Sequence, residues 1–306
     1  MIDEGVFLKP KVPKRLIFIF GIRLIYQNII RWGQSAKPSP FTLLCLDPHF
    51  GWLHPKHMKK SLGFLFLFLL SVAGAKDGGK TIVFLIAERE YKTKESLPVF
   101  AGKTLGDYTL RYCHAEDEGS NRNVLKNAGA IASADLLFVS ARRRAFSGKT
   151  MSLIRKHVAD GKPVLGIRTA SHAFALRKGS PPEGHETWDD WDKTVMGGNY
   201  DGHHGRGKPC RVDRFPSGSD HPILKNLKFP FETPASLYRN SPLPDKSVPL
   251  LRGTIEGFPS EPVAWTHRSP SGGKVFYTSL GHLEDFDKPA FKKLLLNAVK
   301  WCLKKD

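Results

Sequence analysis

The chain has 306 residues, of which 41% are hydrophobic, so it can bury the core of one large domain or of two. Its formal net charge of +18 comes without a dense Lys/Arg run interleaved with aromatic residues, which argues against a nucleic-acid partner. Its four cysteines show no Cys-x-x-Cys spacing, so the sequence predicts no structural zinc site.

Residues 58–75 carry the three parts of a secretory signal peptide. Lys59 and Lys60 form the charged region, residues 62–72 form the apolar region, and Ala73-Gly-Ala75 is a small-x-small cleavage site. The apolar run is too short for a comfortable membrane span, so we predict no stable span in the mature protein. The mature protein is therefore expected to be secreted or periplasmic.

A signal peptide should begin a protein, whereas this one begins at Met58. We therefore predict that residues 1–57 are an upstream extension that is not part of the native protein. The alternative is an anchor helix over residues 16–30, although Arg23 in its middle would cost about 2.5–3.5 kcal/mol on insertion. Without residues 1–75, 37 Lys/Arg and 26 Asp/Glu remain. The resulting net charge of +11 suits an anionic polymer or an anionic substrate, or serves solubility alone.

From residue 81 onward the sequence alternates strand and helix patterns. The predicted strands cover 81–87, 108–114, 135–139 and 163–167, and the predicted helices cover 95–106, 121–132 and the segment around the stripe Met151, Ile154 and Val158. Strands separated by helices of this length imply right-handed βαβ units and a parallel sheet.

The second half of the chain is less regular at first. Residues 179–220, rich in Gly, Pro, His and Trp, are expected to form a long irregular insertion. Strands return near 250–255, 263–267 and 274–279. The last predicted element is a helix whose apolar face is Phe291, Leu294, Leu295, Ala298 and Cys302.

The turn after the strand at 163–167 is where an open α/β sheet presents reactive side chains. Gly166-Ile167 resemble the turn of class I glutamine amidotransferases, which reads Gly-Ile-Cys-x-Gly-His with the cysteine as nucleophile. Arg168 stands at the position of that cysteine. Because a guanidinium cannot attack a carbonyl, we predict that the protein is not a glutaminase.

Polar side chains also follow the other predicted strands of the sheet. With Arg168 they are Glu88, Glu90, Arg142, Arg143, Arg144, His172, His282 and Glu284. The carboxyl ends of parallel strands share one edge, so we expect these side chains to form a ligand-binding cleft there. His282 is the predicted general acid or base, with Glu284 as its orienting partner and Arg168 holding the substrate. The alternative for His282 is a hydrogen bond to loop backbone.

The remaining side chains of this group are predicted to bind substrate. They are Glu88, Arg142, Arg143, Arg144 and His172 at the strand ends, and Asn199, Tyr200, His203 and His204 in the insertion. The insertion is expected to roof the cleft and to bring its histidines to Arg168, His172 and His282. Trp188 and Trp191 either stack on sugar rings or form a small core within the insertion.

The histidines raise the question of a metal. His203 and His204 could bind zinc together with His172 or His282, because neutral imidazoles suit that ion. Adjacent residues rarely ligate one ion together, so we predict no metal and no other cofactor, with zinc as the alternative.

Several motifs together resemble the ThuA-like (trehalose-utilisation) family, which has the class I glutamine amidotransferase-like fold. They are Gly166-Ile167, Gly197-Gly-Asn-Tyr200 through His203-His204, His221-Pro222, Pro262-Val-Ala-Trp265, Gly273 through His282, Pro289-Ala-Phe291 and Leu296 through Trp301. The resemblance covers roughly residues 80–303. It implies that residues 76–306 form one α/β domain, a flavodoxin-like three-layer sandwich with a central, mostly parallel sheet.

The resemblance also implies a role in sugar catabolism. We expect an enzyme that acts on glycosides or oxidised sugars, with a small-molecule sugar as its partner. The alternatives are a non-catalytic carbohydrate-binding module and a metal-dependent hydrolase that uses the histidine cluster. The sequence leaves the oligomeric state open.

Overall fold

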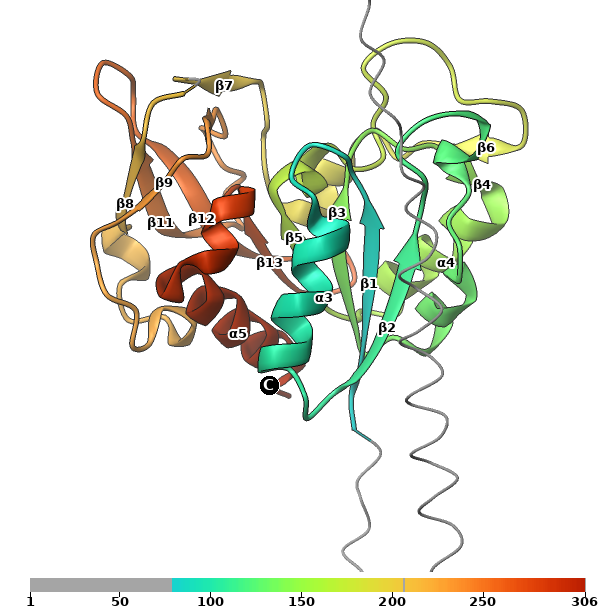
Figure 1. Cartoon of the computed structure of the whole chain (residues 1–306), viewed down its shortest axis with the longest axis horizontal. Coiled ribbons are helices and arrows are strands. Elements are labelled where there is room, and N and C mark those ends of the chain that lie inside the picture. The colour runs from blue at the N-terminus through green and yellow to red at the C-terminus, as the bar shows by residue number, and fades with distance from the viewer. Residues whose placement is uncertain (1–78, 206, 306) are drawn as a thin grey trace, which may run out of the picture. The chain divides into compact units, whose positions relative to one another are not determined.

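The computed structural model describes residues 79–205 and 207–305, and these are built around one nine-stranded sheet (Figure 1). The strand order is β2-β1-β3-β5-β13-β12-β11-β8-β9. The parallel half consists of β1 (Thr81–Ala87), β2 (Thr109–His114), β3 (Leu136–Ala141), β5 (Val164–Ile167) and β13 (Lys274–Thr278). The antiparallel half consists of β12 (Glu261–Arg268), β11 (Val248–Thr254), β8 (Cys210–Arg214) and β9 (Phe231–Thr233). The predicted extension and signal peptide lie outside the described residues.

Helices cover both faces of the sheet. On one face α3 (Thr93–Thr104) and α5 (Pro289–Leu303) pack on one apolar cluster, and on the other α4 (Gly148–Ala159) packs on a second one. Figure 1 shows α3 and α5 in front of the sheet and α4 beyond β2. The parallel strands have the flavodoxin-like order. The predicted three-layer α/β fold is therefore confirmed.

The elements form where apolar residues have the right period. β3 is buried along its whole length, as expected for a central strand covered on both faces. In α5 the predicted face is buried, because its apolar residues recur every three or four positions. Ser147 caps α4 by accepting a hydrogen bond from the Thr150 amide.

The helix predicted over 121–132 is wrong. Two 3₁₀ turns replace it, Ser120–Asn123 and Ala128–Ser133. Asn127 between them has a left-handed backbone with φ of 60°, which an α-helix cannot contain. The Lys126 amide instead donates to the His114 carbonyl at the edge strand β2.

The segment 179–220 contains more regular structure than expected. β6 (His185–Glu186) pairs with β4 (Phe146–Ser147), and β7 (His203–His204) pairs with β10 (Leu237–Tyr238). The segment also supplies β8, an inner strand of the main sheet. In Figure 1, where the arrow of β1 points upward, both short strands lie in the upper part of the domain, β7 above the antiparallel half and β6 at the right beside β4.

Within residues 79–205 and 207–305, no helix is long and apolar enough to cross a membrane.

Candidate functional site

Arg168 occupies a sharp turn at the end of β5. It has φ of 50°, a left-handed conformation that costs a residue with a side chain roughly 1–2 kcal/mol. A 3₁₀ turn, Arg168–His172, follows at once. The Tyr277 hydroxyl donates to the Arg168 carbonyl at 2.5 Å and holds the turn from the neighbouring strand. The strained strand-to-helix turn that presents a nucleophile in other α/β enzymes is thus present here, with an arginine on it.

The Arg168 side chain is buried, and both of its terminal nitrogens are bonded to the protein around it, whereas its Nε has no partner among the described residues. It is 1% exposed. Its Nη1 donates to the Ser236 carbonyl at 3.0 Å and to the Ser279 carbonyl at 2.6 Å, and its Nη2 donates to the Ser236 hydroxyl at 2.9 Å. The guanidinium carbon lies 4.2 Å from the Tyr238 ring centroid and 4.8 Å from that of Tyr91. Arg168 therefore holds together the loops and rings that form this site.

Aromatic rings surround this arginine and link it to the predicted histidines. Tyr238 lies 4.6 Å from Tyr200, 6.2 Å from His172 and 6.4 Å from His203, measured between ring centroids. His172 stacks on Tyr200 at 4.5 Å. Residues from the turn Arg168–His172, the insertion and β10 thus meet at the carboxyl edge of the sheet.

His282 reaches the same cluster through Tyr91, whose ring centroid is 5.9 Å away. It caps the 3₁₀ turn Leu283–Asp287, and its Nδ1 accepts a hydrogen bond of 3.4 Å from the Glu284 amide. An accepting ring nitrogen carries no proton, so the neutral ring has its proton on Nε2. The Glu284 carboxylate lies 3.9 Å from Nδ1, beyond hydrogen-bond distance. The predicted alternative, a bond to loop backbone, is therefore present on Nδ1, and Nε2 remains for proton exchange.

Arginines gather beside His172. Arg143 has φ of 50°, and its amide donates to the His172 carbonyl at 3.0 Å. Burial lowers the pKa of His172 well below its ordinary value, and Arg143, Arg142, Arg168 and Arg177 lower it further. His172 is therefore a neutral imidazole next to several positive charges.

Two of the residues predicted to bind substrate hold the fold together. The Glu88 carboxylate accepts hydrogen bonds from the amides of Glu90, Tyr91 and Thr93 and from the Thr93 hydroxyl, at 2.6–3.0 Å. It thereby satisfies the free amide of Thr93 at the start of α3 and two amides of the preceding loop, and so positions Tyr91. Glu88 acts as a helix cap.

Arg144 ties the end of β1 to the loop after β2. Its Nε donates to the Ala87 carbonyl and its Nη1 to the Glu116 carbonyl, both at 2.8 Å. Burial lowers the pKa of Arg144 to about 10. Its neighbour Arg142 pairs with Glu90 at 3.0 Å, and both arginines line a hollow of about 270 Å³.

The tryptophans of the insertion form its small core. The Trp191 ring is buried, donates through Nε1 to the Ala170 carbonyl at 2.8 Å, and packs on Phe174 and Trp188 at 4.9 and 5.2 Å. This was the second of the two predicted alternatives, so these rings fasten the insertion under the Arg168 turn.

The two neighbouring histidines of the insertion face different surroundings. His203 belongs to the aromatic cluster, whereas His204 lies 3.6 Å from the Glu261 carboxylate and 5.2 Å from the Phe258 ring. Successive side chains of a strand point to opposite sides, and both residues lie in β7. Among the described residues, no three His, Cys, Asp or Glu side chains are grouped so that they could hold a metal ion.

The insertion itself contains a buried carboxyl group. Asp192, in the π-helical turn Asp192–Met196, accepts a hydrogen bond of 2.7 Å from the Tyr200 amide. Its other oxygen, Oδ1, is buried without a partner in the described structure. Burial raises the pKa of Asp192 to about 7. π-Helical turns are frequent at functional sites, and this one fixes the backbone of Tyr200.

The described cysteines do not replace the missing nucleophile. Cys113, Cys210 and Cys302 are free and buried. Burial raises the pKa of the Cys113 and Cys210 thiols to about 11 and that of Cys302 to about 12. Such thiols carry almost no thiolate at neutral pH.

We call the group at this edge the carboxyl-end site. It comprises Arg142, Arg143, His172, Arg177, Tyr200, His203, Tyr238 and His282 around Arg168 and Tyr91. Sequence reasoning missed Tyr91, Arg177 and Tyr238. Tyr91 could have been found, since it directly follows Glu90 after a predicted strand. No sequence pattern pointed to Tyr238, because no helix or strand was predicted around it.

Comparison with known proteins identifies relatives. The family model for trehalose utilisation, ThuA, matches residues 91–302. The structure resembles that of a ThuA-like protein from Parabacteroides merdae, with a TM-score of 0.52 and 14% sequence identity over 74% of this chain and 90% of that one. The N-terminal domain of mmIFT52 aligns with a TM-score of 0.47 and 14% identity, over 74% of this chain and 99% of that one. A comparison with curated proteins gave no match.

Proposed function

The chain belongs to the trehalose-utilisation (ThuA) family, and from this premise we propose that it is a secreted enzyme that acts on an oxidised sugar or its glycoside. A function related to trehalose utilisation follows from the family. The choice of an oxidised sugar rests on the charge of the carboxyl-end site.

The observation that carries the proposal is the gathering of Arg142, Arg143 and Arg177 beside the neutral His172. Arg142 pairs with Glu90, while neither Arg143 nor Arg177 has an ion pair among the described residues. An unmodified glycoside offers no charge for these groups. A carboxylate carries a full negative charge, and a ketone oxygen becomes negative when a neighbouring proton is removed; guanidinium groups stabilise negative charge on either oxygen.

His282 supplies the proton transfer in this proposal. Its side chain is 32% exposed, and its Nε2 is not used by the cap that occupies Nδ1. An imidazole with a free ring nitrogen can give or take a proton at a sugar carbon or oxygen. Tyr200 and His203 provide ring surfaces on which a pyranose can lie.

The test uses a substitution that keeps the capping hydrogen bond and removes the imidazole that would transfer the proton. His282→Asn retains a side chain that accepts from a turn amide, since asparagine is a good cap. The full chain is assayed with trehalose and with trehalose oxidised to a ketone at one ring hydroxyl. We expect turnover of the keto-sugar, and a loss of at least about 100-fold in kcat with little change in binding for the variant.

His221 provides a matched control. It also caps a 3₁₀ turn, its Nδ1 accepting from the Ile223 amide at 3.3 Å, and it belongs to the turn beside α5. His221→Asn should leave kcat unchanged. Equal losses in the two variants would reject His282 as the acid–base group.

The other function classes give different results in the same assay. A carbohydrate-binding module would bind sugar with no turnover by the wild type. A metal-dependent hydrolase would lose activity with a chelator and regain it with zinc. An Arg143→Met variant should raise KM for the keto-sugar more than for trehalose, and equal effects on both would remove the argument for an oxidised substrate.

A further inference from the structure

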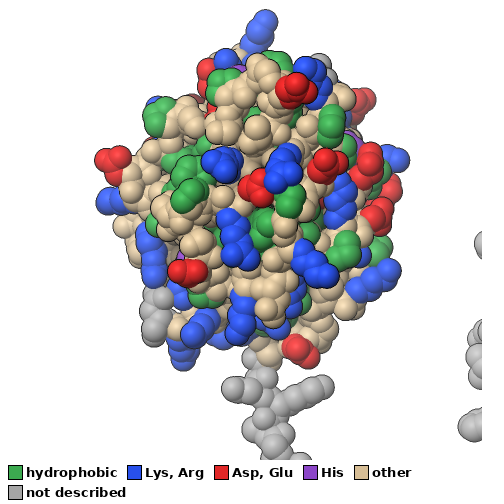
Figure 2. Space-filling model, turned by 90° about the vertical axis from the view of Figure 1, so that its left-hand side faces the viewer, with side chains coloured by type: hydrophobic (Ala, Val, Ile, Leu, Met, Phe, Trp, Pro, Cys, Tyr) green, Lys and Arg blue, Asp and Glu red, His purple; other side chains and the backbone are tan. Residues whose placement is uncertain are grey.

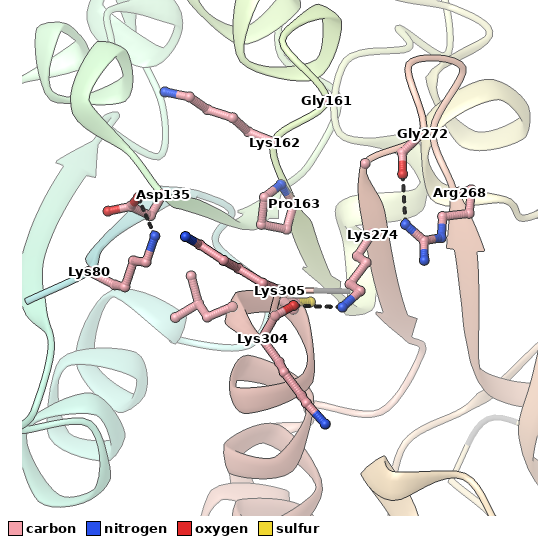
Figure 3. Close-up of a pocket in the computed structure, with 13 residues that line it drawn as sticks. Lys80, Asp135, Gly161, Lys162, Pro163, Arg268, Gly272, Lys274, Lys304 and Lys305 are labelled. Carbon is pink, nitrogen blue, oxygen red and sulfur yellow. Dashed lines mark hydrogen bonds and ion pairs between the residues drawn. The ribbon is translucent and has the colours of Figure 1, made fainter.

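Two adjoining hollows lie at the other end of the sheet, where the parallel strands begin. One, of about 320 Å³, is lined by residues that precede β1, β3, β5 and β13, among them Lys80, Asp135 and Lys162 (Figure 3). The second, of about 430 Å³, lies between the C-terminal half of α5 and residues 222–226. They share Lys274, Lys304 and Lys305.

We call the second hollow the lysine groove. Its lining includes six lysines and no acidic residue: Lys225, Lys274, Lys293, Lys300, Lys304 and Lys305. The adjoining hollow has one carboxylate, Asp135, which pairs with Lys80 at 3.3 Å. Figure 2 shows Lys and Arg side chains gathered over the lower part of the face it presents, at the end of the molecule where α5 ends.

One of these lysines is committed to the fold. Lys274 is 8% exposed, and its Nζ donates to the Lys304 carbonyl at 2.6 Å and more weakly to that of Trp301 at 3.5 Å. It thereby neutralises the carbonyl end of α5. Lys225, Lys300, Lys304 and Lys305 are exposed around it, and Figure 3 shows Lys305 extending into the adjoining hollow while Lys304 points away from it. Their charges repel one another, and a bound anion would relieve that repulsion.

Two further side chains of the groove select among anions. Asn297 donates both amide hydrogens to backbone, to the carbonyls of Ile223 and Lys225 at 2.9 Å each, so only its Oδ1 remains, as an acceptor. This oxygen can accept a hydrogen bond from a ligand that brings donors as well as negative charge. Trp301, whose ring is half-buried against His221 at 5.4 Å, adds an apolar surface.

We propose that the lysine groove binds an acidic glycan, a sugar chain that bears sulfate or carboxylate groups. Such a chain offers anions for the lysines, hydroxyl donors for Asn297 and an apolar sugar face for Trp301. The phosphodiester backbone of DNA has no hydroxyl donors, and a membrane surface presents its charges on a plane rather than inside a groove. The groove contains only lysines among its cations, which act as point charges and do not impose the forked geometry of arginine on phosphate.

The proposal is tested by calorimetric titration of the full chain with sugar hexasaccharides. Chondroitin sulfate and hyaluronate distinguish sulfate from carboxylate as the recognised group, and maltohexaose is the neutral reference. We expect binding of at least one acidic hexasaccharide, none of maltohexaose, and an affinity that falls with salt.

The decisive variant is Lys300→Gln with Lys304→Gln, which removes two charges from the groove and keeps good helix-forming side chains. The double variant should bind the acidic hexasaccharide at least about tenfold more weakly. The slope of log affinity against log salt concentration should decrease by about two, one for each lysine removed. The matched control is Lys94→Gln with Lys103→Gln on α3, exposed positions outside the groove, which should bind as the wild type does. If the two double variants bind the hexasaccharide equally well, the lysine groove is not the binding site.

Two probes test the class of ligand. A single-stranded DNA oligonucleotide and vesicles containing phosphatidylserine are titrated at the same anion concentration. If either binds as tightly as the acidic hexasaccharide and depends equally on Lys300 and Lys304, the groove is a general polyanion surface and the glycan assignment fails. The His282→Asn variant should bind the hexasaccharide normally, so this test is independent of the proposed enzyme activity.

Discussion

Arg168 shows how one residue changes the chemistry of a turn while preserving its shape. The left-handed turn after β5 remains, but the side chain on it is a buried cation that bridges two serine carbonyls and lies between two tyrosine rings. Tyr91 separates it from His282. At the position where amidotransferases carry a nucleophile, this chain has a buried arginine that packs against two tyrosine rings.

The first prediction concerns the stability that Arg168 provides. Arg168→Ala leaves the carbonyls of Ser236 and Ser279 buried without this donor and should lower the free energy of unfolding by about 3 kcal/mol, measured by urea denaturation. Arg168→Gly loses the same contacts but tolerates φ of 50°, so it should be about 1 kcal/mol more stable than the alanine variant. An alanine variant within about 0.5 kcal/mol of wild type would contradict this role.

The second prediction concerns Asp192. Its folded-state pKa of about 7 exceeds the ordinary value of 3.8, so the folded protein holds this proton more tightly than the unfolded chain does. The contribution of Asp192 to stability should therefore fall as the pH rises from about 4 to about 7, because the unfolded chain loses this proton in that range while the folded protein retains it. Asp192→Asn has no such proton, and its stability relative to wild type should rise on the order of 2 kcal/mol between about pH 5 and about pH 7.

A neighbouring aspartate controls for the pH effect. Asp190 is exposed, and Asp190→Asn should follow the wild-type stability at both pH values in urea denaturation. If Asp192→Asn also parallels the wild type, the carboxyl is ionised in the folded protein and the raised pKa is wrong.

At the scale of elements, β5 and the π-helical turn are packed with no room between them. A Cβ atom on Gly166 would lie 2.7 Å from the Met196 sulfur and 3.2 Å from the Tyr277 ring. The turn is also held by Trp265, whose Nε1 donates to the Met196 carbonyl at 2.8 Å. The strand that leads into Arg168 and the loop that carries Tyr200 are therefore packed tightly against each other and form one rigid package.

The third prediction tests this package with two glycine substitutions. Gly166→Ala should lower the free energy of unfolding by about 1–3 kcal/mol, because Met196 and Tyr277 must move. Gly102→Ala, in the exposed interior of α3 with no atom within 4 Å, should raise it by about 0.5–1 kcal/mol. Thermal and urea unfolding give both values. A neutral Gly166→Ala would show that the package can relax.

At the scale of the whole described domain, the two ends of the sheet carry different chemistry. The carboxyl end gathers arginines, tyrosines and histidines, and the opposite end gathers lysines along α5. The strands separate these regions by the length of the sheet, so substitutions at one end should leave ligand binding at the other unchanged.

The fourth prediction concerns the mature chain. If residues 58–75 are a signal peptide, the protein recovered from its native host should begin at Lys76, which mass spectrometry of the intact protein and its peptides measures. A chain that begins at Lys76 should fold as the full one does, since β1 begins at Thr81. Peptides from residues 1–57 in the native protein would contradict the prediction.

Sequence patterns were enough to predict the parallel half of the sheet, the edge that carries the polar residues, and the lack of a nucleophile at Arg168. These predictions rest on local patterns: apolar periods in β3 and α5, and turn residues directly after the strands. What the polar residues do depends instead on how the elements pack. Glu88 and Arg144 satisfy backbone groups, and β-strand alternation separates His203 from His204.

The physical reason is the distance along the chain. Arg168 bonds to Ser236 and Ser279, which are 68 and 111 residues away, and Tyr238 joins the site only because β10 pairs with β7. No periodicity or spacing encodes such contacts, because they depend on how complete elements pack. The sequence could predict which residues reach the carboxyl edge, whereas only packing determined which of them are buried supports and which are left to meet a ligand.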